Sequence, residues 1–142
     1  KWLPEELKIK KIIPIIVERI SKFGDIKNMV ENGELDFFYK EPTYEKEKLI
    51  YKDTSADKII NNLEQAIDSL NKIDNNDFNK ENIKIILMGL ANKLETRGEI
   101  LHPMRFALSG LDKSPDPFIL SEILGKEKTI NRLNKAIKLL KI

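Results

Sequence analysis

The chain has 142 residues, of which 41% are hydrophobic and 34% charged, and its formal net charge is +2. These values are ordinary for a globular protein with a buried core, and a charge this small does not by itself indicate nucleic-acid binding. The absence of cysteine and the single histidine exclude disulfides and thiolate or histidine-rich metal sites, and no apolar run reaches the ~18–20 residues of a membrane span.

The start of the sequence indicates a piece of a longer protein. It begins at Lys1 rather than at methionine, and it lacks the basic, apolar and small-residue regions of a signal peptide. Together with the lack of cysteine, this leads us to expect a fragment of a cytoplasmic protein that has no membrane partner.

The first forty residues are expected to form short helices. One begins near Leu3, with acidic residues in its first turn, and is broken by Pro14. The next, from Ile15 to about residue 22, places Arg19 outside its apolar stripe. A further short helix ends at Gly33.

Two longer helices follow, and their apolar residues recur with a 3.6-residue period. The first covers residues 55–72, with Thr54 or Ser55 as its cap. The second covers residues 79–96 and is expected to end at Gly98. Because a short polar loop joins them, we expect an antiparallel helical hairpin.

The segment 101–125 holds three of the six prolines, two of the six glycines and the only histidine. Pro103 is expected to open a short helix, and Gly110 to close it in a left-handed conformation. Asp116 would cap a second short helix that has Pro117 at its first position. A link stiffened by prolines suits a surface that holds a partner in fixed register. A corner needed only for packing explains it equally well.

Gly125 is expected to close that second short helix, and residues 126–140 form the last helix, with apolar residues on one face. No stretch alternates with period two for long enough to predict a sheet. The sequence therefore predicts an all-α fold. We expect two small helical subdomains packed together, residues 1–75 and residues 76–142.

Charge is distributed unevenly along the chain. From residue 101 onward there are eight Lys or Arg against four Asp or Glu, whereas the first hundred residues have 17 against 19. This weakly favours RNA contact in the last part.

No complete phosphate-binding loop occurs, and His102 lacks a plausible nucleophile partner, so it is expected to be a cap or a packed ring. The sequence predicts no catalytic residue and no metal site.

Four motifs lie in the last 45 or so residues: Pro103-Met104-Arg105-Phe106-Ala107-Leu108-Ser109-Gly110, Ser114-Pro115-Asp116-Pro117-Phe118, Leu124-Gly125-Lys126-Glu127 and Arg132-Leu133. Together they resemble the carboxy-terminal part of bacterial glutamate–tRNA ligases. In that family the segment belongs to the all-helical anticodon-binding cage of these class I synthetases. The resemblance implies a fragment that grips the anticodon loop of tRNA(Glu), so that tRNA is positioned and selected for a catalytic domain of the same polypeptide.

The resemblance also implies what this chain should lack. Ligases of this family use ATP and magnesium on a Rossmann domain with HIGH-like and KMSKS-like motifs, and neither motif occurs here. We therefore expect no cofactor in this chain and no aminoacylation by the fragment alone, although the parent protein would be a glutamate–tRNA ligase.

The resemblance assigns five residues to anticodon binding. Arg105, expected near the start of its short helix, matches the arginine of a Pro-x-Arg motif that faces the anticodon. Ser114, Pro115 and Pro117 match a turn that touches the middle and first anticodon bases. Arg19 resembles an arginine that discriminates the last base. Four lysines are candidates for phosphate contacts: Lys113, Lys126, Lys128 and Lys135.

Each assignment has a structural alternative. Arg105 could form a salt bridge with Asp112 or Asp116, the turn could be a packing corner, and Arg19 could be an exposed helix arginine. For the lysines, the solvated-surface interpretation is the favoured one.

Two other functions fit an all-helical chain. A protein-interaction module without RNA binding would expose an apolar patch between the subdomains instead of a basic surface around Arg105. A DNA-binding domain would need a recognition helix with several Arg, Asn or Gln side chains, and the helix expected at 117–124 is nearly devoid of them, which argues against DNA as a partner.

Overall fold

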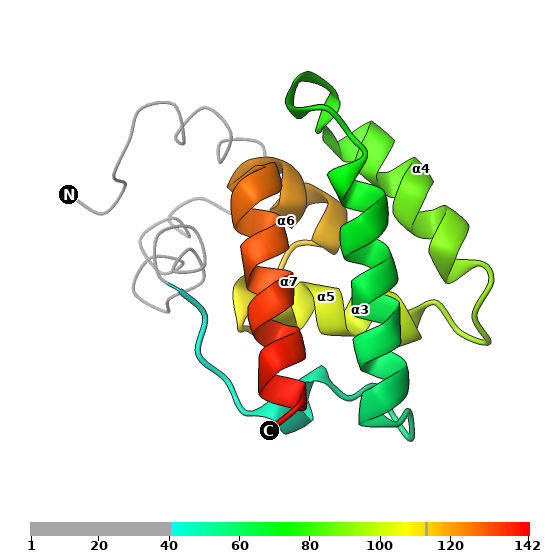
Figure 1. The fold of residues 1–142 in the computed structure, drawn as a ribbon, viewed down its shortest axis with the longest axis vertical. Coiled ribbons are helices and arrows are strands. Elements are labelled where there is room, and N and C mark those ends of the chain that lie inside the picture. Colours follow the sequence, from blue (N-terminus) through cyan, green and yellow to red (C-terminus); the bar gives the residue numbers. More distant parts are fainter. Residues whose placement is uncertain (1–40, 113) are drawn as a thin grey trace, which may run out of the picture.

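The computed structural model describes residues 41–112 and 114–142, and this part of the chain contains helices and no strand (Figure 1). The described elements are two 3-10 helices and five α-helices: η2 (Lys46–Leu49), α3 (Ala56–Asn71), η3 (Asn75–Asp77), α4 (Lys80–Ala91), α5 (Gly98–Ser109), α6 (Pro117–Leu124) and α7 (Lys126–Leu140). The all-α prediction is confirmed. The helices predicted within the first forty residues lie outside the described residues.

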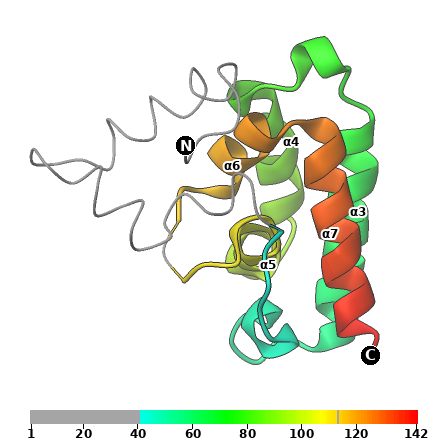
Figure 2. The ribbon, with the colours of Figure 1, turned by 90° about the vertical axis from the view of Figure 1, so that its left-hand side faces the viewer.

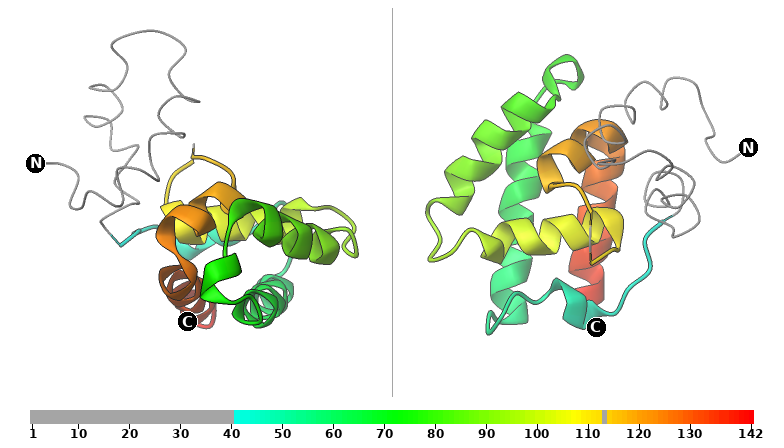
Figure 3. Two further views of the ribbon diagram at one scale, coloured as in Figure 1. Left: turned by 90° about the horizontal axis from the view of Figure 1, so that it is seen from above. Right: turned by 180° about the vertical axis from the view of Figure 1, so that it is seen from behind.

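Helices α3 and α7 stand side by side, and α5 runs across both of them (Figures 1 and 3). Figure 2 shows α5 nearly end-on beside this pair, with α6 above it. Helix α5 contacts α3, α4, α6, α7 and η2, so it is the central element of the described bundle. The ends of α5 therefore have fixed positions relative to the other helices.

One hydrophobic core runs through the described residues. Leu63 of α3, Leu87 of α4, Met104 of α5 and Leu133 of α7 are each fully buried in it. Residues on both sides of position 75 share this core, so α3 packs directly on helices from the later part of the chain. The division into subdomains at residues 1–75 and 76–142 stays a prediction.

The prediction for residues 55–72 is confirmed by α3. Ser55 is its N-cap, and the Ser55 side chain accepts a hydrogen bond from the Lys58 N–H. Ile59, Leu63 and Leu70 are fully buried on one face, as the 3.6-residue period predicts. The predicted last helix, 126–140, is likewise confirmed by α7.

The predicted end of the second long helix is wrong. Helix α4 ends at Ala91, and Gly98 begins α5 instead of closing α4. Thr96 and Glu99 explain the new start, because the Glu99 carboxylate accepts the Thr96 N–H at 3.1 Å, as in a capping box. Gly98 is needed there because a Cβ would lie 2.2 Å from Cζ of Tyr51.

The prediction that Pro103 opens a short helix is also wrong, because Pro103 lies inside α5. A proline has no N–H, so the Glu99 carbonyl one turn earlier loses its helical donor. Asn62 of α3 replaces that donor: its Nδ2 donates to the Glu99 carbonyl at 2.9 Å in a buried position. The helix thus begins five residues earlier than predicted, and Arg105 lies in its second half.

Replacing Asn62 with alanine should lower the free energy of unfolding by about 1–3 kcal/mol, because a buried carbonyl is left without a donor. Urea denaturation measures this, with Asn61→Ala on the exposed side of α3 as the matched control. Pro103→Ala supplies a new N–H, so Asn62→Ala should cost less in that background. An equal cost in both backgrounds would contradict the hydrogen-bond argument.

Glu99 should make stability depend on pH. The Lys58 ammonium 2.7 Å away, followed by the Thr96 N–H, lowers the pKa of Glu99 below its ordinary 4.5. Since the folded-state pKa is the lower one, the stabilisation is complete above about pH 4.5 and is lost as the pH falls through the folded-state pKa. Thermal unfolding between about pH 3 and 7 should show the difference between wild type and Glu99→Gln shrinking in acid. Glu64→Gln, which removes an exposed carboxylate of α3, is the matched control.

Candidate functional site

The link between α5 and α6, residues 110–116, is held at both ends and is called the corner below. Gly110 ends α5 with φ +70°, and a Cβ there would lie 2.8 Å from Cβ of Pro42. Asp116 begins α6, where its Oδ1 accepts the Phe118 and Ile119 N–H groups at 2.9 Å, and Pro117 is the first helical residue. The predicted roles of Gly110, Asp116 and Pro117 in ending and starting these helices are confirmed.

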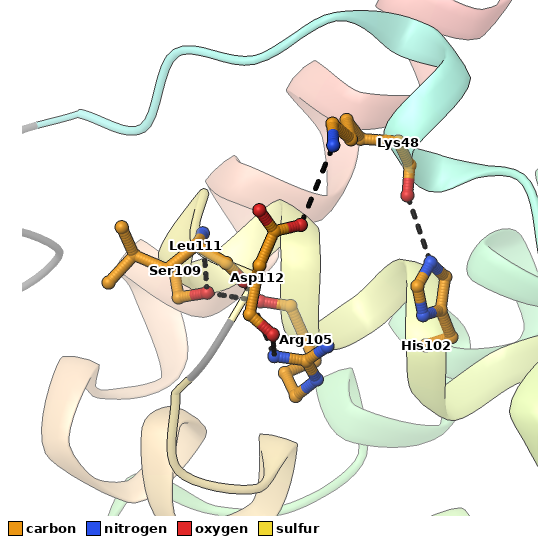
Figure 4. A network of polar contacts seen from close by, with 6 residues as sticks. All are labelled: Lys48, His102, Arg105, Ser109, Leu111 and Asp112. Atoms are coloured by element: carbon orange, nitrogen blue, oxygen red, sulfur yellow. Dashed lines mark hydrogen bonds and ion pairs between the residues drawn. The ribbon is translucent and has the colours of Figure 1, made fainter. Parts of the chain in front are cut away.

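Arg105 is anchored to the corner through one nitrogen. Its Nη1 donates to the carbonyls of Leu111 at 3.3 Å and Asp112 at 3.0 Å (Figure 4). It also donates to Ser114 Oγ at 3.1 Å. The guanidinium also lies 5.5 Å from the ring centroid of Phe106. Asp112 therefore contacts Arg105 through its main chain, and within the described residues no carboxylate forms a salt bridge with Arg105.

The anchoring of Arg105 leaves one side of its guanidinium unused. Nε and Nη2 make no hydrogen bond to any residue that the structure describes, and Arg105 is only half-buried. These two nitrogens form one edge of the planar fork, which suits two acceptor atoms lying side by side. In Arg105, Nη1 is thus bound to the corner, whereas Nε and Nη2 have no partner among the described residues.

Ser114 serves the corner itself. Its Oγ accepts from Arg105 Nη1 and donates its proton to the Pro115 carbonyl at 3.1 Å. Pro115 is half-buried, and Pro117 is buried in the first turn of α6. The structure therefore brings together four of the five residues predicted to bind the anticodon, and their binding role stays a prediction. The fifth, Arg19, lies outside the described residues.

The predicted phosphate-contacting lysines lie mostly on a different face. Lys126, Lys128 and Lys135 line an open groove of about 800 Å³ along α7. The Lys126 ammonium donates to the carbonyls of Asn71 and Ile73 at 2.9 and 2.7 Å, which closes the C-terminus of α3. Lys113 lies outside the described residues. The phosphate contacts stay a prediction.

Sequence reasoning did not identify the residues that hold the last turn of α5, next to the corner. Arg132 of α7 is almost fully buried, and its Nη1 donates to the Leu108 carbonyl in the last turn of α5 at 2.5 Å. Its Nε lies 3.7 Å from Oε2 of Glu41, whose other oxygen binds Lys135 at 2.7 Å. The sequence signal that could have revealed this role is the position of Arg132 beside the apolar face of the helix predicted at 126–140.

The charges in this support act on one another. Burial lowers the pKa of Arg132, and the Glu41 carboxylate opposes that effect. The hydrogen bond from Lys135 lowers the pKa of Glu41. The buried guanidinium and the two charges beside it therefore form one coupled group at this end of α5.

A second contact that the sequence did not predict joins His102 of α5 to η2. His102 Nε2 lies 3.0 Å from the Lys48 carbonyl (Figure 4). The ring packs against Tyr51 and Phe106, with centroids 5.6 and 5.3 Å away. Burial, the main cause, lowers the pKa of His102. The expectation of a packed ring is confirmed.

The described part of the chain contains no group of three or more His, Cys, Asp or Glu residues that could hold a metal ion. None of its helices is both long and apolar enough to cross a membrane.

Comparison with known proteins relates this geometry to a family. The model of the anticodon binding domain family matches residues 1–137. A glutamate–tRNA ligase of Clostridium botulinum is 34% identical over 143 residues, covering 98% of this chain and 28% of that protein. Glutamate–tRNA ligase 2 of Thermoanaerobacter pseudethanolicus is 32% identical over 130 residues, covering 91% of this chain and 26% of that protein.

Solved structures give the same result. A glutamate–tRNA ligase of Elizabethkingia meningosepticum superposes with a TM-score of 0.73 at 31% identity, covering 96% of this chain and 26% of that one. The glutamate–tRNA synthetase of Elizabethkingia anophelis gives 0.67 at 34% identity. The resemblance to glutamate–tRNA ligases is confirmed, and the chain spans little more than a quarter of the length of these relatives. Because the family model covers nearly all of the sequence, the chain belongs to the anticodon-binding domain family.

Proposed function

We propose that this chain is the anticodon-binding region of a cytoplasmic bacterial glutamate–tRNA ligase. It would bind the anticodon loop of tRNA(Glu), and so position and select that tRNA for aminoacylation. The family match over residues 1–137 and the ligase relatives at 32–34% identity support this proposal. Contacts made here serve selection, because a wrong base leaves polar groups unpaired.

The observation that carries the proposal is the half-anchored guanidinium of Arg105. Anticodon bases are single-stranded and can be splayed out, so that a protein reads their Watson–Crick edges and stacks on their faces. The Nε–Nη2 edge, which makes no hydrogen bond to the described residues, offers two parallel donors to adjacent acceptors on a base, and a guanidinium also stacks. Since Nη1 is held by three acceptors in the corner, this edge is presented with little side-chain entropy left to lose.

The other predicted residues receive graded roles in the proposal. Ser114 holds Arg105 and presents Pro115 beside it, whereas the buried Pro117 shapes the corner through its main chain. Arg19 would discriminate the last anticodon base. Phosphates would be contacted by lysines among Lys113, Lys126, Lys128 and Lys135, with Lys126 the weakest candidate because its ammonium already binds two carbonyls.

The proposal places the chemistry elsewhere in the polypeptide. The relatives are about four times longer than the matched region, and the parent's catalytic domain would bind ATP and magnesium there. This chain alone would not aminoacylate tRNA. Its partners would be tRNA(Glu) and that catalytic domain.

The alternative, a protein-interaction module, finds no support in the described residues. Their exposed large hydrophobic side chains are Ile85 on α4 and Ile142 at the C-terminus. Because these two side chains stand in different elements, the described residues offer no exposed apolar patch of the kind that such a module needs.

Arg105→Ala should weaken binding of an anticodon stem-loop with the tRNA(Glu) sequence by about 5- to 150-fold, the equivalent of ~1–3 kcal/mol for one base-reading arginine. The loss should be smaller for stem-loops with altered anticodons, because they already lack the correct acceptors. Arg105→Lys keeps the charge but not the fork, so it should resemble Arg105→Ala. Fluorescence anisotropy at a fixed salt concentration measures these affinities.

Arg97→Ala is the matched control for this series. Arg97 is an exposed arginine at the opposite end of α5, and its Nε donates to Asn92 Oδ1 at 3.1 Å. It should bind like wild type. If Arg105→Ala also binds like wild type, Arg105 does not read the anticodon.

A further inference from the structure

Lys48 contacts both elements whose relative position determines where the Arg105 guanidinium lies. Its carbonyl is 3.0 Å from His102 Nε2 on α5, and its Nζ is 3.5 Å from Oδ1 of Asp112 in the corner (Figure 4). Asp112 in turn accepts Arg105 Nη1 on its carbonyl. One residue of η2 therefore bridges the helix that carries Arg105 and the loop that anchors it.

The two ends of this bridge differ in rigidity. The main chain of Lys48 is fixed, since the adjacent Leu49 is fully buried and His102 packs against Phe106. A neutral His102 donates from Nε2 to the Lys48 carbonyl, and burial favours the neutral ring by lowering the pKa of His102. The ammonium end is exposed, as is the Asp112 carboxylate, so this ion pair is the adjustable part.

We propose that Lys48 is a positioning residue for the corner: it holds Asp112, and through it the carbonyl that anchors Arg105, at a fixed distance from α5. The inference rests on the proposed function in one respect, because the held guanidinium is taken to contact RNA. Lys48 itself need not touch RNA. Its effect should be modest, because an exposed ion pair changes an equilibrium by only about two- to fivefold.

The bridge predicts effects that a simple charge contact does not. Lys48→Met removes a positive charge, and Asp112→Asn removes a negative charge while keeping the carbonyl that Arg105 uses. If both residues acted only through long-range electrostatics, the first change would weaken RNA binding and the second would strengthen it. Under the positioning role, both changes weaken binding, by about two- to fivefold.

The experiment measures anticodon stem-loop affinity for Lys48→Met, Asp112→Asn and the double variant. The double variant should be no weaker than the single variants, because they break the same bridge. Lys46→Met is the matched control, since it removes the same charge from the same short helix at a lysine with no hydrogen bond or ion pair to the described residues. It should bind within twofold of wild type.

A second readout does not depend on RNA. In the free protein, ¹⁵N relaxation of the Leu111 and Asp112 amides and of the Arg105 Nε–H should show larger motion in Lys48→Met and Asp112→Asn than in Lys46→Met. Tighter binding by Asp112→Asn, an equal loss in Lys46→Met, or unchanged relaxation in Lys48→Met would overturn the inference. A failure of the proposed function is a separate result, because Arg105→Ala would then bind as wild type whatever the relaxation data show.

Discussion

The geometry of the corner depends on one nitrogen atom. Nη1 of Arg105 donates to two carbonyls and one hydroxyl of the corner, so a short proline-containing link without regular secondary structure is tied to a helix side chain. Main-chain carbonyls in such a link would otherwise need water or another donor. The same contact that orders the link immobilises the guanidinium. The same three hydrogen bonds therefore order the link and hold the guanidinium in place.

The position of that guanidinium is set by how α5 is held. Pro103 removes a hydrogen bond from the middle of the helix, and Asn62 of α3 supplies the missing donor to Glu99. Arg132 of α7 donates to the Leu108 carbonyl in the last turn. The helix thus uses polar contacts from both of its long neighbours near its two ends. Such contacts restrict sliding and rotation more than apolar packing does, because hydrogen bonds are directional.

These supports also explain why a small, nearly neutral bundle could read RNA. The net charge of +2 gives little long-range attraction, so selectivity would come from a few placed donors. Carboxylates near the corner are occupied: Asp116 caps α6, and Asp112 pairs with Lys48. The chain belongs to the anticodon-binding domain family, and it spans about a quarter of the ligases that it matches.

The sequence by itself determined the helical class, the period of α3 and α7, and the local ends at Gly110, Asp116 and Gly125, because caps and periodicity depend on neighbours in the chain. The resemblance also assigned Arg105 of the Pro-x-Arg motif and Ser114, Pro115 and Pro117 of the following turn to one predicted binding site. The start of α5 depends partly on the local Thr96–Glu99 contact. The tertiary structure decided that Pro103 lies inside α5 and that Tyr51 packs against Gly98, since Asn62 and Tyr51 act across long sequence separations. It likewise revealed the support from Arg132 and Lys48, because a side chain's hydrogen-bond partners depend on packing that no local pattern encodes.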